Sequence, residues 1–381
     1  MKLKHLWITG GLGLCALALG SAAAAQQAVK LGYAGPLSGA QAQYGKDMQN
    51  GLTLAVEQFN ATHPKIGGQT VQFQLISEDD QADPRNGTSV AQKLVDDGIQ
   101  GMLGHFNSGT TIPASRIYNQ AGIPEIAMAT ATEYTQQGYK TAFRMMTSDT
   151  QQGSVMGAFA VNKLGFRNIA IVDDRSAYGQ GLADEFQKAA KAAGATIVRR
   201  EYTNDKATDF KAILTQIKSR NPDAVFYGGA VGQSAPLVRQ MRELGMKATL
   251  MSGEMSKTDD FIKLAGAQAA EGTVCSLAGL PLEQMPGGAN YRQQYEKRFG
   301  TPVQTYSPYA YDGAMAMMKA MVAANSADPA KYLSALAATN TQGVTARHYA
   351  YDEKGDLKDG GITVYKVIGG KWTPVESVGG Q

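Results

Sequence analysis

Hydrophobic and polar positions along the chain follow two alternating patterns. Short runs that are apolar, or apolar at every second position, are typical of strands, and the longer stretches between them have the apolar spacing of helices. In the first such stretch Met48, Leu52 and Val56 form the apolar face. A capping acid before proline, at Asp83-Pro84, opens the next helix in the preferred way. The strands predicted in this part of the chain are residues 28–33, 71–76, 101–104 and 123–127.

The same pattern starts again after about residue 148. Strands are predicted at residues 168–172, 196–198, 224–227 and 248–251, and helices at residues 181–193, 209–218 and 234–244. Such alternation indicates parallel sheets that are covered by helices on both faces. Two rounds of it predict an α/β protein with two similar lobes.

The part of the chain after about residue 290 has a different pattern. Helices are predicted at residues 290–299, 309–324 and 329–338, and strand-like pieces at residues 348–351 and 362–367. If these pieces return to both lobes, the chain crosses between the lobes several times; the pattern alone leaves this open.

The first residues predict a secretory signal peptide. Lys2 and Lys4 precede an apolar run at residues 6–19, and the small residues 23–25 follow as cleavage chemistry. We therefore expect residues 1–25 to be removed and the protein to reach the periplasm. No later segment approaches the ~18 uncharged apolar residues of a membrane span, so a soluble mature protein is expected.

Charge and cysteine content narrow the classes of partner. The chain has 36 Lys and Arg against 33 Asp and Glu, and removal of Lys2 and Lys4 leaves 34 against 33. This nearly equal number of positive and negative charges argues against a nucleic-acid or membrane-surface partner, which would favour a basic patch. Cys275 is the single cysteine after the signal peptide, so no intramolecular disulfide is expected.

Common catalytic and metal-binding signatures are missing from the sequence, including H-E-x-x-H, paired C-x-x-C, the P-loop and G-x-S-x-G. His105 lies three residues before Ser108, which leaves a Ser–His pair open, although a histidine satisfied by local hydrogen bonds is favoured. The acidic pairs 79–80 and 173–174 are cation ligands or, more commonly, capping groups. We expect no enzyme activity, no metal and no cofactor.

Polar side chains follow several of the predicted strands. In open parallel sheets ligands bind beyond the carboxyl ends of the strands, where helix N-termini also point. Ser108 at a helix start would suit a carboxylate, but it is equally well explained as an N-cap. Thr130 has the same two explanations, and Glu254 would neutralise an ammonium or cap a helix. Tyr178 follows the first strand of the second lobe.

Six motifs occur together in the chain, in a specific order and with a specific spacing. They are residues 33–39 (YAGPLSG) with 43–45 (QYG), 79–84 (DDQADP), 104–115 (GHFNSGTTIPAS), 178–181 (YGQG), 227–229 (YGG) and 352–357 (DEKGDL). In this combination the chain resembles the periplasmic leucine/isoleucine/valine-binding proteins over essentially all of the sequence after the signal peptide. The resemblance implies a type I periplasmic-binding-protein fold, in which two doubly wound lobes are joined by three crossovers and close on a ligand.

The resemblance also implies lobe boundaries and roles for particular residues. Lobe 1 would contain residues 26–147 and 279–350, and lobe 2 residues 148–278 and 351–381. Ser108 and Thr130 would hold the ligand carboxylate, and Thr130, the Met128 carbonyl group and Glu254 its ammonium group. The other residues implied to line the site are Tyr44, Phe106, Asn107, Ala129, Tyr178, Ala230 and Tyr306.

Two departures from the family concern the pocket. The disulfide near the first-lobe site of well-studied members is missing, since Asn107 and Ala82 or its neighbour stand at those positions, and Ala230 replaces a tyrosine. Met128 and Met255 are also bulkier than expected.

We therefore expect a monomeric binding protein that delivers a branched-chain amino acid to an inner-membrane ABC permease. A ligand-sensing protein, or a binder of urea, amides or aromatic acids, is the alternative, and Glu254 disfavours these neutral or acidic ligands.

Overall fold

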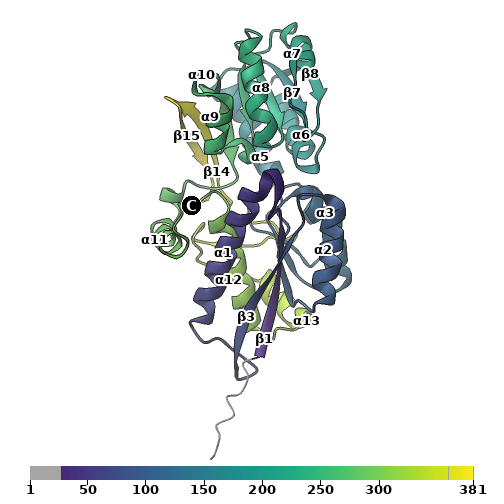
Figure 1. The fold of residues 1–381 in the computed structure, drawn as a ribbon, viewed down its shortest axis with the longest axis vertical. Coiled ribbons are helices and arrows are strands. Elements are labelled where there is room, and N and C mark those ends of the chain that lie inside the picture. Colours follow the sequence, from purple (N-terminus) through teal and green to yellow (C-terminus); the bar gives the residue numbers. More distant parts are fainter. Residues whose placement is uncertain (1–26, 359, 381) are drawn as a thin grey trace, which may run out of the picture.

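The computed structural model describes residues 27–358 and 360–380, which form two lobes stacked end to end (Figure 1). The predicted signal peptide and cleavage site lie outside the described residues. The lobe 1 sheet has the order β2 (Lys65–Ile66), β3 (Gln69–Asp79), β1 (Gln27–Gly35), β4 (Gly101–Gly104), β5 (Glu125–Ala127) and β6 (Ala142–Arg144). Its strands are parallel apart from the short β2, which pairs antiparallel with β3.

Lobe 2 is built on a second sheet with a parallel centre and an antiparallel edge. Its order is β15 (Lys371–Val378), β14 (Ile362–Ile368), β11 (Val274–Leu277), β10 (Thr249–Ser252), β9 (Ala224–Gly228), β7 (Asn168–Asp173) and β8 (Thr196–Tyr202). The antiparallel pairs are β11–β14 and β14–β15. The chain passes between the sheets after β6, after β11 and before β14, which makes three crossovers.

Helices cover both faces of each sheet, as the pattern predicts. In lobe 1, α1 (Ala42–Asn60) and α12 (Ser307–Ala323) lie on one face, and α2 (Pro84–Asp96) and α3 (Ser108–Gln120) on the other (Figure 1). Lobe 2 contains α5 (Asp149–Ala158), α6 (Ala177–Ala192), α7 (Lys211–Lys218), α8 (Val231–Glu243), α9 (Asp259–Ala265) and α10 (Ala267–Ala270). The remaining elements are α4 (Glu133–Gln136), α11 (Gly288–Phe299), α13 (Pro329–Ala337), β12 (Asn340–Thr341), β13 (Tyr349–Ala350), a π-helical turn (Phe159–Lys163) and 3₁₀ turns at Gly39–Gln41, Glu254–Ser256 and Leu282–Gln284.

The α/β fold with two doubly wound lobes is confirmed, and the differences from the expected elements are local. The Asp83 side chain caps α2 as predicted, since it accepts from the amides of Arg85 and Asn86 at 2.8 and 3.1 Å. The helix expected from residue 181 begins at Ala177, because the Ser176 hydroxyl oxygen accepts from the Gly179 amide at 2.9 Å and caps it. Strands β2, β6, β11, β12 and β15 were not predicted; the first four have only two to four residues each.

Close packing of α1 against α12 fixes the start of α12. A Cβ atom built on Gly51 in α1 would lie 2.2 Å from the Ser307 carbonyl oxygen, a distance that real side chains do not reach. Glycine at position 51 therefore lets the two helices approach closely, despite its poor helix propensity. The approach matters because Tyr306 immediately precedes α12.

We predict that Gly51→Ala lowers the free energy of unfolding by about 1–3 kcal/mol, the usual cost of overpacking. Gly232→Ala in α8 is the matched control, because a Cβ atom there meets no atom within 4 Å. The control should be neutral or gain up to about 1 kcal/mol from helix propensity. Urea unfolding measures both values, and equal stabilities of the two variants would contradict the close-packing explanation.

Candidate ligand-binding site

A small cavity of about 10 Å³ lies where the two lobes meet. It is lined by Phe106, Asn107, Ser108, Met128, Thr130, Met146, Tyr178, Glu254, Met255 and Tyr306. Eight of these ten are among the residues singled out from the sequence. The lining residues come from five separate stretches of the chain in addition to the first crossover, which carries Met146.

The lobe 1 side of the cavity is a helix N-terminus with a hydroxyl group. Ser108 is the first residue of the 13-residue helix α3, and its side chain is buried. Its hydroxyl oxygen accepts from the Ala131 amide at 3.2 Å. The helix dipole and the amides of the first turn favour an anionic group here. The side-chain amide nitrogen of Asn107 is already engaged, because it donates to Gln41 Oε1 at 2.7 Å.

The loop after β5 carries the second set of lobe 1 groups. The Met128 amide donates to the His105 carbonyl group at 3.0 Å, so this loop is tied to the strand end beside it. The Thr130 carbonyl group accepts from the Asp149 amide at 2.8 Å, which joins the loop to the first turn of α5. Both Met128 and Thr130 are buried and line the cavity.

Lobe 2 contributes a buried acid. Glu254 follows β10, is 3% exposed, and its Oε2 atom has no hydrogen-bond partner among the described residues. Burial raises the pKa of this carboxyl group. Gln152 and Tyr178 face it and offset part of the rise, although neither the Gln152 amide nitrogen nor the Tyr178 hydroxyl group reaches hydrogen-bonding geometry. The side-chain oxygen Oε1 of Gln152 accepts a hydrogen bond from the Ser276 hydroxyl group at 2.7 Å.

A second buried acid, Asp149, lies behind Thr130. It is the first residue of α5, it is fully buried, and neither of its carboxylate oxygens has a partner among the described residues. Burial and the nearby charge of Glu254 raise the pKa of Asp149 to about 8, while Thr130 and Arg144 offset part of the rise. Two carboxyl groups that are buried together without a cation favour a positively charged group between them.

Three aromatic rings pack together at the other end of the cavity. Tyr44 stacks on Phe106 with ring centres 5.5 Å apart, and Tyr306 meets both rings edge to face at 5.7 and 4.8 Å. The Tyr44 hydroxyl group donates to the Met255 carbonyl group of lobe 2 at 3.0 Å. Tyr306 is held by Asp47, whose carboxylate accepts from its backbone amide at 2.7 Å.

Tyr44, Ala129 and Ala230 do not line the small cavity. Tyr44 packs behind Phe106, and the Ala129 carbonyl group is bound by Arg144. Ala230 is the partly exposed residue before α8. Ala230 is therefore not part of this cavity's wall.

Met146, Met255 and Asp149 lie at or near the cavity and were not predicted from the sequence to belong to the site. Met255 directly follows Glu254, so adjacency was an available signal. Met146 and Asp149 lie in and just after the first crossover, where no strand–helix pattern marked a site. They are found only once the two lobes are placed together.

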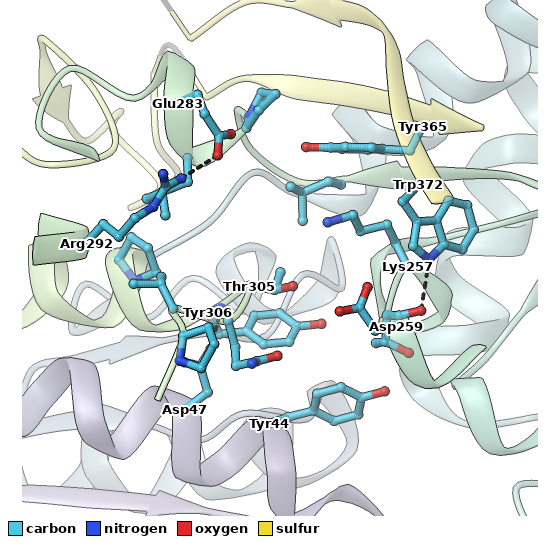
Figure 2. Close-up of a pocket in the computed structure, with 18 of the residues that line it drawn as sticks. Tyr44, Asp47, Lys257, Asp259, Glu283, Arg292, Thr305, Tyr306, Tyr365 and Trp372 are labelled. Atoms are coloured by element: carbon cyan, nitrogen blue, oxygen red, sulfur yellow. Dashed lines mark hydrogen bonds and ion pairs between the residues drawn. The ribbon is translucent and has the colours of Figure 1, made fainter. Parts of the chain in front are cut away.

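A larger cavity of about 770 Å³ lies on the far side of Tyr306 (Figure 2). Figure 2 shows the Lys257 amine pointing into it beside the ring of Tyr365, whose centre is 4.5 Å away, and the Glu283–Arg292 ion pair across from it. Its lining does not include Ser108, Thr130 or Glu254. The larger cavity has charged groups of its own, but it lacks the helix N-terminus at Ser108 and the buried acid Glu254, so the small cavity is the candidate site.

The remaining candidate groups have structural roles. His105 is fully buried, and its ring nitrogens meet Asp80 Oδ2 at 2.7 Å and the Tyr118 hydroxyl group at 3.1 Å, so it is satisfied locally and does not pair with Ser108. Asp174 Oδ1 accepts from the Ser176 amide and hydroxyl group at 2.9 and 2.6 Å. Within residues 27–358 and 360–380, no group of three or more metal-ligating side chains occurs. In the same ranges no helix is both long and apolar enough to cross a bilayer.

Two stacked α/β lobes, three crossovers and an interlobe cavity with charge-binding groups define a two-lobed solute-binding protein. The chain belongs to the periplasmic binding protein family, whose model matches residues 28–371. It is 34% identical over 358 residues to Leu/Ile/Val-binding protein homolog 1 of Brucella melitensis, covering 93% of this chain and 94% of that protein. It is 33% identical to a leucine-, isoleucine-, valine-, threonine- and alanine-binding protein of Pseudomonas aeruginosa, covering 90% of each.

Solved structures share the fold. A leucine binding protein from Thermotoga maritima superposes with a TM-score of 0.84 at 23% identity, covering 92% of this chain and 98% of that one. A branched-chain amino acid transporter substrate binding protein from Streptococcus pneumoniae, solved with isoleucine, gives 0.82 at 24% identity, covering 93% and 100%. The expected type I periplasmic-binding-protein fold is confirmed.

We predict that Tyr44→Phe weakens ligand binding by roughly 2- to 10-fold, because it removes one interlobe hydrogen bond of about 0.5–1.5 kcal/mol and keeps the ring stack. The effect should lie in faster dissociation, as measured by stopped-flow kinetics. Tyr202→Phe on the surface of lobe 2 is the control, and its dissociation rate should not change. A Tyr44→Phe protein that releases ligand at the wild-type rate would show that this bond does not hold the lobes together.

Proposed function

We propose that this protein is the periplasmic substrate-binding component of an ABC importer and that it captures a branched-chain α-amino acid between its lobes. The observation that carries the proposal is the polarity of the small cavity. One lobe supplies the N-terminus of α3 with the Ser108 hydroxyl group, and the other supplies the unpartnered buried acid Glu254. A zwitterion needs both kinds of group, since a charge buried without a partner makes binding unfavourable.

The proposed ligand lies with its carboxylate at Ser108 and Thr130. Its ammonium group contacts Glu254, Thr130 and the Met128 carbonyl group, and its side chain meets the aromatic and methionine residues. The apolar groups available for the side chain are Phe106, Met146, Tyr178, Met255 and Tyr306. A branched aliphatic side chain suits such a surface, because its burial contributes about 1.5–3 kcal/mol.

The names of the relatives support the choice of ligand class and role. They are called amino-acid-binding proteins. The proposal further includes a monomeric, non-enzymatic protein without cofactor. It is exported after removal of residues 1–25 and recognised by an inner-membrane permease. A solute binding protein from R. palustris that shares the fold was solved with benzoate, which corresponds to the aromatic-acid alternative. Glu254 disfavours that alternative, because benzoate has no ammonium group to pair with a buried acid.

Lobe closure is part of the proposed mechanism. A cavity of about 10 Å³ holds at most about one water molecule, so an amino acid must enter while the lobes are apart. The proposed moving bodies are residues 26–147 with 279–350 and residues 148–278 with 351–381. A ligand that contacts both bodies favours the closed state by its differential affinity.

We predict that Glu254→Gln weakens leucine binding by roughly 2–5 kcal/mol, because a buried ammonium group loses its charge partner. Ser108→Ala should cost less, about 1.5–3 kcal/mol, since the amides of α3 remain. Calorimetry with leucine, isoleucine and valine measures both. Glu243→Gln on the exposed face of α8 is the control and should bind as the wild type does. A Glu254→Gln change below threefold would remove Glu254 from the site.

A pH dependence follows from the pKa of Asp149, which is raised to about 8. Below this pKa the protonated form of Asp149 is favoured without ligand, and a nearby ammonium group favours the ionised form, so binding should release up to one proton. Affinity should therefore rise with pH from about 6 towards 8, by at most tenfold per unit. Calorimetry in phosphate and in Tris at pH 7 counts the protons released, and Asp149→Asn should lower the count. A proton count of zero for the wild type would contradict the prediction.

A further inference from the structure

Arg144 is a fully buried arginine at the end of β6, and it is hydrogen-bonded to the loop that carries Thr130. Its guanidinium group donates to the Ala129 carbonyl group, and to the Ala131 carbonyl group at 3.0 Å. The two carbonyl groups flank Thr130, which lines the candidate site. Arg144 itself does not line the cavity, so any influence on ligand passes through this loop.

Asp356 holds Arg144 from the other side. Its Oδ1 atom accepts from Arg144 Nε at 2.7 Å, and both of its oxygens accept from the Thr135 hydroxyl group, at 3.0 and 3.1 Å. Thr135 in turn accepts from Arg144 Nη2 at 3.1 Å. The three side chains form a closed set of hydrogen bonds in which the arginine charge is neutralised.

The turn that carries Asp356 is shaped to reach β6. Asp352 Oδ1 accepts from the amides of Lys354 and Asp356 at 2.8 and 3.0 Å. Gly355 has a φ of 91°, and a Cβ atom there would lie 2.1 Å from the Ala142 carbonyl oxygen. The glycine carbonyl group accepts from the Arg144 amide at 2.9 Å. The conformation and the close approach require glycine, which explains a residue of the 352–357 motif that ligand contacts leave unexplained.

The pair also joins two of the three interlobe connections. Arg144 directly precedes the crossover from β6 to α5, and Asp356 lies on the crossover that leads to β14. The same ion pair therefore contacts the ligand loop and both of these connections.

We propose that Arg144 and Asp356 are positioning residues, which hold the 129–131 loop in its ligand-binding conformation and link it to the interlobe connections. The inference rests on the proposed function, since it concerns the same amino-acid site. Fixed geometry of a binding loop matters because hydrogen bonds to a buried zwitterion weaken steeply when they are misaligned. Without the pair, Thr130 is still present, but its loop is no longer fixed in the ligand-binding conformation.

The test compares Asp356→Asn and Arg144→Lys with Arg200→Lys, each first shown to be folded by thermal unfolding. Arg200 is the matched control, because it pairs with buried Asp173 at 2.8 Å in lobe 2, and neither residue lines the small cavity. We expect the first two variants to bind leucine roughly 3- to 30-fold more weakly. The control should lose stability and keep its affinity. If Asp356→Asn does not fold, Thr135→Ala is used in its place.

A double-mutant cycle separates positioning from general destabilisation. In the Asp356→Asn background, Thr130→Val should cost much less affinity than in the wild type, whereas Glu254→Gln in lobe 2 should keep its full effect. Independent, multiplicative effects of Thr130→Val and Asp356→Asn would overturn the inference, as would unchanged affinity in Asp356→Asn. A wild type that binds no amino acid would overturn the proposed function, and the positioning role with it, so the two failures are distinguishable.

Discussion

The burial of two carboxyl groups without a cation is the constraint on which the site depends. Asp149 and Glu254 are both shielded from water, and both have oxygens without partners among the described residues. Ionising them in this place is unfavourable, and raised pKa values are the result. Under the proposed function, a ligand ammonium group would relieve this penalty, so stability and recognition would be linked.

The topology brings these groups together although they are far apart in sequence. Ser108 and Thr130 follow neighbouring parallel strands of lobe 1, and Glu254 follows a central strand of lobe 2. Parallel strands collect their carboxyl ends at one edge of a sheet, so the two edges face each other across the lobe junction. Helix α12 returns to lobe 1 after the second crossover and delivers Tyr306 to the same place. The first two crossovers thus assemble one site from both lobes.

The sequence allowed the repeated strand–helix pattern and most strand-end residues to be predicted, because both depend on local periodicity. Ser108, Thr130 and Glu254 follow recognisable strands, and the structure brings them to one cavity. Strands β6 and β11 were missed; the predicted strands β5 and β4 are equally short, so length alone does not account for the difference. Asp149 was missed because its burial depends on the packing of lobe 2 against the Thr130 loop, a contact between separate parts of the chain.

Under the proposed function, the two ends of the cavity would determine different aspects of specificity. Charge recognition at Ser108 and Glu254 would be strict, because a buried charge left unpaired costs several kcal/mol. The side-chain end is lined by Met128, Met146 and Met255 together with aromatic rings, and methionine adapts to different shapes. Hydrophobic pockets of this kind discriminate by only about 1–3 kcal/mol per methylene group. An α-amino acid is therefore specified much more strongly than any one aliphatic side chain, because the first choice is made by charges and the second by packing.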